Sequence, residues 1–302
     1  MKVLVLGATG FIGFPVAQAL VRAGHIVYGV TRSESKTKQL AAEEIIPIVA
    51  SPTSDAWHSY IASLDVVIEA VGGAEQLAAD SAAILQAVTR AAQTLRPEHA
   101  PKLTFIYTSG TWVHGDSATD IVSDTTPLTR PIQLTSWRPA HEQAVIKSDV
   151  LNGIVIRPSL LYGRSGSILS WLFGKAAQSA SAGGPVQWVG KPGGRYSTVH
   201  ADDLADLYLR AAEKAQLVGG QIFDGSNNSS ESVDDLLQRL IVVSNAKGAY
   251  EYVQPSNPFE SAITTTAIIR PYLARALLGW IPRKPSLVDG LDVYYAAFLA
   301  SQ

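Results

Sequence analysis

Short apolar runs alternate with segments of helical periodicity along the first half of the chain. The first run, residues 3–6, precedes a segment in which Val16, Leu20 and Val21 share one helical face, and Gly24 closes that segment. An alanine-rich stretch over 74–95 predicts a long helix. Five later apolar runs are bounded by turn residues, as buried strands are: 26–30, 45–49, 66–71, 103–107 and 153–156. This repetition predicts an α/β fold with a doubly wound parallel sheet.

Three glycines follow the first apolar run directly, at Gly7, Gly10 and Gly13. Glycine at these positions permits a tight turn, lets the backbone approach a pyrophosphate and lets the next helix pack closely. The helix that we expect to begin at Phe11 and Ile12 offers free N–H groups and the positive end of its dipole. Because a strand precedes the glycines and an amphipathic helix follows them, they indicate a dinucleotide cradle rather than a glycine-rich turn alone.

The second half of the chain, from about residue 163, has a looser pattern. Gly, Ser and Pro gather at 163–167, 183–185 and 191–194, and helical periodicity returns at 202–215 and 233–243. We therefore divide the chain into a nucleotide-binding part over 1–163 and a second part over 164–302 that should carry substrate contacts. Ligands of open α/β sheets lie beyond the carboxyl ends of the strands, so the strand-end loops and the C-terminal segments should surround the substrate.

Composition narrows the range of partners. The 302 residues carry 24 basic and 26 acidic side chains without a basic run, which favours a small-molecule substrate over nucleic acid or an anionic membrane. The absence of cysteine excludes disulfides, thiolate nucleophiles, iron–sulfur clusters and cysteine zinc sites. Since no apolar run reaches the length of a signal peptide or a membrane span, we expect a cytoplasmic protein. We also expect a monomer or a homodimer.

Five sequence blocks, in this order, resemble those of the extended and atypical short-chain dehydrogenases. They are GATGFIG at 7–13, FIYTSGTWVHG at 105–115, IRPSLLYGRSG at 156–166, STVHADDLADLYLRAAE at 197–213 and ALLGWIPRKPSLVDGL at 276–291. The resemblance covers essentially the whole chain and includes the NAD(P)-dependent epimerase and dehydratase relatives. It implies a Rossmann fold with a small C-terminal substrate lobe and cofactor contacts at the strand ends.

The resemblance also implies which residues hold the cofactor. It places pyrophosphate contacts in the glycine turn, adenosine ribose contacts after the second strand, further contacts after the fourth, and nicotinamide contacts after the run at 153–156. In that order the residues are Gly7, Thr9, Gly10, Phe11, Ile12 and Gly13; Thr31 and Arg32; Ala70, Val71 and Gly72; and Pro158 with Ser159.

Arg32 favours NADP over NAD as the cofactor. An acidic residue at the end of the second strand would bind a ribose 2′-hydroxyl and repel a 2′-phosphate. The chain instead has Arg32 there, with Lys36 and Lys38 following. The alternative is that these cations belong to an ordinary solvated turn.

The catalytic pattern of the family is broken in this chain. Active members carry a Tyr-x-x-x-Lys pair, in which the tyrosine exchanges the substrate proton and the cation lowers its pKa. None of the eleven tyrosines has a lysine four residues later. Alignment on Glu142 puts Leu134 in the tyrosine position and Arg138 in the lysine position, whereas a shift by three residues puts Trp137 and His141 there.

The position of the family's catalytic serine falls on Gly110, between Ser109 and Thr111. Arg138 stays protonated near neutral pH, so it could position the cofactor ribose but not act as an acid. Tyr107 and His141 are further acid candidates, although Tyr107 is more typical of a core aromatic residue. Strand-end loops, where we expect the substrate, hold two more candidates. The catalytic candidates are therefore Ser109, His114, Tyr162 and Arg138.

Two other constellations receive less weight. His200, Asp202 and Asp203 suggest a metal, but no further histidine or carboxylate stands at ligand spacing. We therefore predict no metal site and expect Asp202 to cap the following helix. Ser109 and His114, with Asp116 or Asp120, would suggest a hydrolytic triad, but no nucleophile elbow surrounds the serine.

Three functions remain in order of preference. The first is an NADP-dependent oxidoreductase of the atypical short-chain class that acts on a carbonyl or alcohol with an altered acid. The second is a non-catalytic NADP-binding sensor or regulatory protein. The third, nucleotide-sugar epimerisation or dehydration, depends most on the missing tyrosine.

Overall fold

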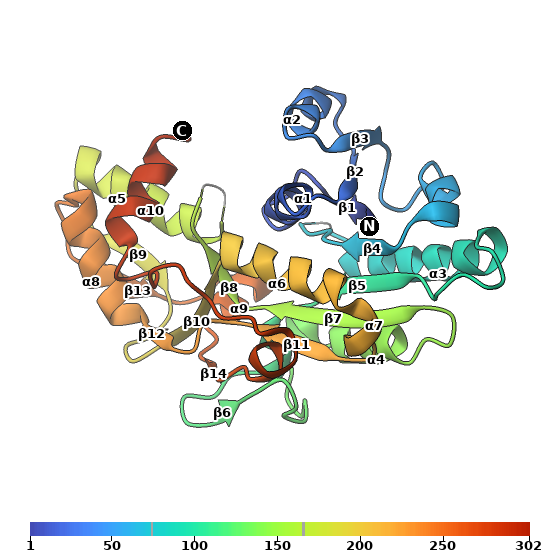
Figure 1. Ribbon diagram of the computed structural model, residues 1–302. Helices are drawn as coiled ribbons and strands as arrows, with labels where there is room; N and C mark the ends of the chain where they lie inside the picture. The colour runs from blue at the N-terminus through green and yellow to red at the C-terminus, as the bar shows by residue number, and fades with distance from the viewer. Residues whose placement is uncertain (74, 165–166) are drawn as a thin grey trace.

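A seven-stranded parallel sheet forms the centre of the computed structural model, which describes residues 1–73, 75–164 and 167–302 (Figure 1). The strand order is β11-β7-β5-β4-β1-β2-β3, and each neighbouring pair is parallel. This topology confirms the doubly wound α/β fold. The strands are β1 (Lys2–Leu6), β2 (Ile26–Thr31), β3 (Ile46–Val49), β4 (Val66–Glu69), β5 (Thr104–Thr108), β7 (Asn152–Pro158) and β11 (Ile222–Gly225).

Helices cover both faces of the sheet, which explains why the strands read as continuous apolar runs. In β1, Val3 and Val5 pack with α1 (Gly13–Arg22) and α6 (Ala201–Glu213), while Leu4 and Leu6 pack toward α3 (Leu77–Leu95). The remaining helices around the sheet are α2 (Thr37–Ala42), α4 (Arg138–Ile146), α7 (Ala215–Val218) and the short turns η1 (Glu34–Lys36), η2 (His58–Ser63), η3 (Thr111–His114) and η4 (Gln133–Thr135).

The predicted elements agree with the observed ones to within a few residues at their ends. The run at 66–71 forms a strand only to Glu69, so Ala70, Val71 and Gly72 become a strand-end loop. The long helix begins at Leu77, not at residue 74, which lies outside the described residues together with 165–166 of the predicted loop. Helix α1 begins at Gly13, two residues later than expected, because Phe11 and Ile12 belong to the turn.

A smaller lobe at one end of the molecule has an apolar core of its own, which includes Trp188, Leu237 and Phe298 (Figure 1). It carries one of the two helices predicted for the second half, since α8 (Val233–Ser244) covers the stretch expected at 233–243. Its elements, with those that link it to the sheet, are β6 (Ile121–Val122), β8 (Leu160–Tyr162), α5 (Leu169–Ala182), β9 (Val186–Val189), β10 (Arg195–His200), β12 (Ser230–Ser232), α8 (Val233–Ser244), β13 (Tyr250–Val253), α9 (Pro258–Ile263), β14 (Ile268–Ile269), η5 (Ala274–Leu278) and α10 (Leu291–Leu299).

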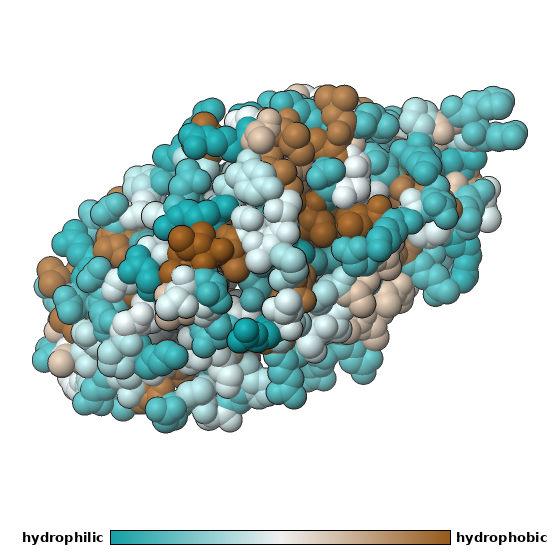
Figure 2. Space-filling view, turned by 90° about the horizontal axis from the view of Figure 1, so that it is seen from below, coloured by the Kyte–Doolittle hydropathy of each residue, from teal (hydrophilic) through white to brown (hydrophobic). Residues whose placement is uncertain are grey.

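The surface carries separate hydrophobic patches among hydrophilic residues, as the view from below shows (Figure 2). Exposed apolar side chains of this kind are common on folded proteins and indicate no particular partner. Among the described residues, no helix combines the length and the apolar content that a membrane crossing requires.

Candidate functional site

The glycine turn lies between the carboxyl ends of β1 and β4. Gly7 has a φ of +84°, and a side-chain carbon there would come within 2.6 Å of the Ala70 carbonyl oxygen. A side-chain carbon at Gly13 would overlap the Gly7 carbonyl oxygen. Gly10 donates its N–H to that same oxygen at 2.9 Å and is itself exposed at the mouth of a cavity. The turn therefore needs glycine for its own packing at two positions and presents bare backbone at the third.

A cavity of about 180 Å³ opens beside this turn, and we name it the glycine-turn cavity. Thr9 and Thr31 meet in its wall, with 3.3 Å between their hydroxyl oxygens. Ser51, Thr53 and Asp80 also line this cavity, and the sequence did not predict them. They come from the loop after β3 and from the first turn of α3, which reach the same cavity as the end of β2. The predicted residues that line the cavity are Gly7, Thr9, Gly10, Thr31, Arg32, Ala70, Val71 and Gly72.

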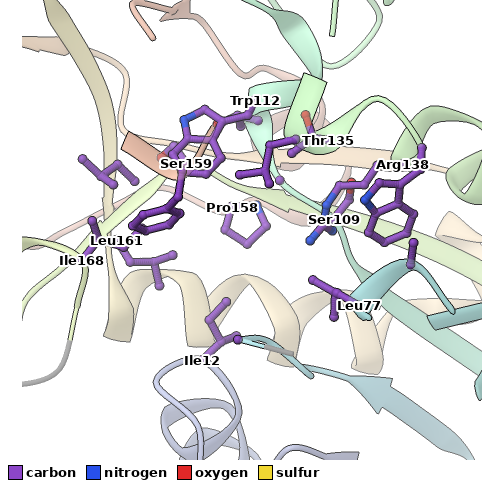
Figure 3. Close-up of a pocket in the computed structure, with 18 of the residues that line it drawn as sticks. Ile12, Leu77, Ser109, Trp112, Thr135, Arg138, Pro158, Ser159, Leu161 and Ile168 are labelled. Atoms are coloured by element: carbon purple, nitrogen blue, oxygen red, sulfur yellow. The ribbon is translucent and has the colours of Figure 1, made fainter. Parts of the chain in front are cut away.

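A larger cavity of about 720 Å³, the main cavity, lies where β5 and β7 end (Figure 3). Ile12 of the glycine turn borders it, and so do Pro158 and Ser159 after β7. Phe11 and Gly13 line neither of these two cavities. The predicted pyrophosphate, ribose and nicotinamide residues thus fall along one continuous edge of the sheet, which is where open α/β folds bind their ligands.

Arg138 is the first residue of α4 and extends into the main cavity. Its Nη1 donates to the Tyr107 hydroxyl and to the Thr108 carbonyl oxygen, both at 3.0 Å, and its guanidinium lies 4.9 Å from the centre of the Trp137 ring. No described residue accepts a hydrogen bond from its Nε or Nη2. The cation is therefore anchored on one nitrogen and keeps donors available for a ligand.

Leu134 and Trp137 also line the main cavity, whereas His141 does not. The His141 ring packs edge-on against Tyr107, with 4.6 Å between the ring centres, and burial lowers the pKa of the imidazole. Leu134 stands in the short turn η4 that precedes α4, and this turn brings its side chain to the cavity. The family's tyrosine position, aligned on Glu142, is thus occupied by an aliphatic side chain at the cavity wall.

Ser109 connects the main cavity to a buried chain of charged groups. Its hydroxyl donates to a carboxylate oxygen of Glu142, which also accepts from Arg157 Nε at 2.9 Å. Arg157 in turn forms an ion pair with Asp224 at 3.5 Å, and Asp224 bonds to His114 Nε2 at 2.9 Å. Burial alone would lower the pKa of Arg157, but the hydrogen bonds and charges of Glu142 and Asp224 outweigh burial and raise it. These charges hold one another in place inside the protein.

His114 and Tyr162 are not among the residues that line the main cavity, contrary to our expectation from their strand-end positions. The His114 side chain is 1% exposed and faces Asp224. The Tyr162 hydroxyl donates to the Pro285 carbonyl oxygen at 2.8 Å, and burial raises its pKa. Strand ends place the backbone near a ligand, but packing decides which way each side chain points. Of the four catalytic candidates, the structure brings Ser109 and Arg138 to the cavity.

Asp202 does not cap α6, so that expectation is wrong. His200 is the N-cap residue, and its Nδ1 accepts the Asp202 N–H at 3.0 Å. The Asp202 carboxylate instead binds Arg164 at 2.7 Å and Lys284 at 3.2 Å. The described residues include no cluster of histidine and acidic side chains able to hold a metal ion.

Glu69, at the end of β4, is a buried carboxylate that sequence reasoning missed. Its side chain is 1% exposed, accepts a hydrogen bond from Ser81 at 2.6 Å, and has one oxygen without a described partner. Burial raises its pKa to about 7, against the opposing effects of the Ser81 bond and the Arg138 charge. In the sequence, the only sign of this buried carboxylate is an acidic residue that directly follows the aliphatic residues of β4.

We expect Glu69→Gln to remove a pH dependence of stability. Between pH 4.5 and about 7 the folded chain holds a proton on Glu69 that the unfolded chain has released, so the free energy of unfolding falls as pH rises. Glutamine mimics the protonated form, and the variant should gain about 2 to 3 kcal/mol over the wild type at pH 8 and little at pH 4. Urea unfolding at several pH values measures this. Glu251→Gln, which changes an exposed carboxylate, is the control. If the free energies of unfolding of the wild type and Glu69→Gln change with pH in parallel, the raised pKa of Glu69 is contradicted.

Known proteins are similar to this chain in sequence and in fold. The model of the NAD dependent epimerase/dehydratase family matches residues 3–224. An uncharacterized protein, C2A9.02, of Schizosaccharomyces pombe is 24% identical over 98% of this chain and all of its own length. The epimerase family protein SDR39U1 homolog, chloroplastic, of Arabidopsis thaliana is 22% identical over 80% of this chain and 70% of its own length.

Two solved structures share the fold over nearly the whole of both chains. UDP-glucuronic acid 4-epimerase from Bacillus cereus, in complex with UDP-glucuronic acid and NAD, has a TM-score of 0.78 at 18% identity and covers both chains completely. Human epimerase family protein SDR39U1 with NADPH has a TM-score of 0.73 at 18% identity and covers 98% of this chain and 99% of its own. Since the family model spans well over half of the sequence, this chain belongs to the NAD dependent epimerase/dehydratase family.

Proposed function

We propose that this chain is an NADP-dependent oxidoreductase that acts on a carbonyl or alcohol group of a small molecule. The observation that carries the proposal is the main cavity, where Ser109 and Arg138 meet a mostly apolar space directly beside the glycine turn. A concave apolar site with a few convergent polar groups is the usual form of a small-molecule site. Cytoplasmic location and a monomeric or homodimeric state stay predictions.

NADP is the favoured cofactor because of the charge at the end of β2. Arg32 lines the glycine-turn cavity in the place where an acid would select NAD. The bare backbone at Gly10 fits the approach of a pyrophosphate, so the residues present suit a dinucleotide. Family members carry either cofactor, since the human SDR39U1 structure holds NADPH and the Bacillus epimerase holds NAD.

Bound NADPH would supply a hydride for the carbonyl carbon. The chain must then stabilise the negative charge on the carbonyl oxygen and provide a path for its proton. The free donors of Arg138 stabilise negative charge on that oxygen. Arg138 does not give up its own proton. The Ser109 hydroxyl joins the cavity to the Glu142 carboxylate, so we assign it a relay of the substrate proton. In alcohol oxidation Ser109 would take the substrate proton and pass its own proton to Glu142, and in carbonyl reduction the proton would return along the same path. With Leu134 in the tyrosine position, we expect turnover roughly 10² to 10⁴ times slower than a tyrosine acid would allow.

A non-catalytic NADP sensor is the second candidate, and Leu134 is the observation that favours it. Among the described residues that line the main cavity there is no tyrosine, histidine or lysine. A protein that only binds the cofactor needs no proton donor there.

Steady-state assays with NADPH and a panel of aldehydes and ketones test the proposal. We expect NADPH to bind and to be consumed with at least one carbonyl class, and Ser109→Ala to lower kcat more than it raises KM. Binding without consumption across the panel would refute the oxidoreductase assignment and leave the sensor.

We expect Arg32→Asp to reverse the cofactor preference. Loss of a charged hydrogen bond to the 2′-phosphate, at about 2 to 3 kcal/mol, weakens NADPH binding roughly 30- to 150-fold, while NADH binding improves or stays the same. Fluorescence titration with both cofactors measures the change. Lys102→Asp makes the same charge change at an exposed position outside both cavities and is the matched control. Equal losses in the two variants would contradict a specific role for Arg32.

A further inference from the structure

The walls of the main cavity are mostly apolar, and Ser109 and Arg138 lie together at one end, with Leu77 nearby (Figure 3). Trp112, Leu161 and Ile168 lie toward the other end, which we name the apolar end. Ser159 also lies there, but its hydroxyl already donates to the Gly225 carbonyl oxygen at 3.1 Å. This division resembles the shape of a molecule with one carbonyl group and a hydrocarbon body. Apolar walls of this kind stabilise a ligand by removing its apolar surface from water.

Charge is scarce in the walls of the main cavity. Among its described lining residues, Arg138 and Glu75 are the charged ones. One nitrogen of Arg138 is already bonded to Tyr107 and Thr108, and Glu75 repels anions. A phosphate or carboxylate placed toward the apolar end would lose its hydration and find no cation there.

The adjoining space does not supply the missing cations. A cavity of about 510 Å³ beside α9 shares Leu134 with the main cavity, and we name it the side cavity. Its described lining residues include Asp116, Gln133 and Asn257 but neither lysine nor arginine. A diphosphate that extended from the main cavity into the side cavity would meet another carboxylate instead of a counter-charge.

We propose, resting on the oxidoreductase function above, that the substrate is an uncharged carbonyl compound with an aromatic or branched alkyl body, or the matching alcohol. The carbonyl oxygen lies toward Arg138 and Ser109, and the body packs against Trp112 and Ile168. The site does not take a nucleoside diphosphate sugar. This chain therefore differs in substrate class from the UDP-sugar epimerase whose fold it shares.

Phe259 is the specificity residue that this arrangement singles out. It lies on α9 of the C-terminal lobe, lines the main cavity, and meets the Trp112 ring at 6.3 Å between ring centres with a 76° interplanar angle. Its side chain is 43% exposed, so it contributes little to folding and is available to a ligand. We expect it to close the apolar end over an aromatic body.

Calorimetric titration of the NADPH-loaded protein tests the substrate class without requiring turnover. The probes are benzylacetone, its para-carboxylate analogue and UDP-glucose. We expect benzylacetone to bind at least ten-fold more tightly than its carboxylate analogue, and UDP-glucose to show no binding. Equal or tighter binding of the carboxylate, binding of UDP-glucose, or no binding of benzylacetone would each overturn the proposal.

NADPH oxidation in the same samples separates this proposal from the function on which it rests. Benzylacetone that binds as expected but is not reduced upholds the ligand class and counts against the oxidoreductase assignment, which the panel of aldehydes and ketones then decides. Phe259→Ala should weaken benzylacetone binding about ten-fold and leave NADPH binding unchanged. Leu217→Ala removes an apolar side chain that is 85% exposed and outside the cavities, and it is the matched control. An unchanged benzylacetone affinity in Phe259→Ala would overturn the placement of the body.

Discussion

Replacement of Glu142 by leucine is expected to lower the free energy of unfolding by about 3 to 5 kcal/mol, a large part of the stability of a typical domain. Glu142 is fully buried and holds Arg157 through two hydrogen bonds, of 2.9 and 2.6 Å. Without this carboxylate the guanidinium, which is 3% exposed, keeps only the longer ion pair with Asp224. A buried charge that loses its partner is far costlier than the pair is stabilising.

Guanidinium unfolding of the single and double variants measures this effect. Arg157→Met in the Glu142→Leu background should recover part of the loss, because an apolar pair of similar volume removes the uncompensated charge. Asp206→Ala breaks the partly exposed ion pair with Arg210 within α6 and should cost about 0.5 kcal/mol or less. A loss below about 1 kcal/mol in Glu142→Leu would show that the buried chain of charges is not structural.

Replacement of Gly13 by alanine is expected to reduce NADPH affinity at least about 100-fold. The new side-chain carbon would overlap the Gly7 carbonyl oxygen and lie 3.2 Å from the Ala8 Cα, and all of these neighbours are backbone atoms. The turn must therefore move away from β1, and Gly10 moves with it. We also expect a loss of about 1 to 3 kcal/mol in stability, as overpacked sites show.

Fluorescence titration with NADPH, with circular dichroism to confirm folding, separates the two effects. Gly24→Ala provides the comparison, since Gly24 has a φ of +84° but no atom lies within 4 Å of a side-chain carbon there. That variant should lose about 1 kcal/mol of stability and retain NADPH affinity. Affinity within three-fold of wild type in Gly13→Ala would place the cofactor away from this turn.

The sheet and the glycine turn were predictable because local sequence determines both. Strands buried on two faces must be continuously apolar, and β1, β2 and β5 show this directly in the sequence. The turn needs glycine at Gly7 and Gly13 for contacts within a few residues or with the adjacent strand. The structure accordingly brings most of the predicted cofactor residues to one edge of the sheet.

The buried hydrogen bonds and ion pairs behind the site join residues that are far apart in the sequence, so no local sequence pattern predicts them. Ser109 meets Glu142, 33 residues away, and His114 meets Asp224, 110 residues away. Sequence position suggested that His114 faces the substrate, yet its partner lies on an edge strand of the sheet. The burial of Glu69 was likewise not predictable from the local sequence, since it results from the packing of α3 over the end of β4.

The two tryptophans of the main cavity give the protein an optical reporter of its own. Trp137 lies against Arg138 and Trp112 lies against Phe259, so a ligand that enters the cavity changes the surroundings of both indole rings. Trp57, Trp188 and Trp280 are buried in the cores and do not line the main cavity, so we expect their emission to change little when a ligand binds there. Occupancy of the cavity can therefore be followed by intrinsic fluorescence, without a label and without a reaction.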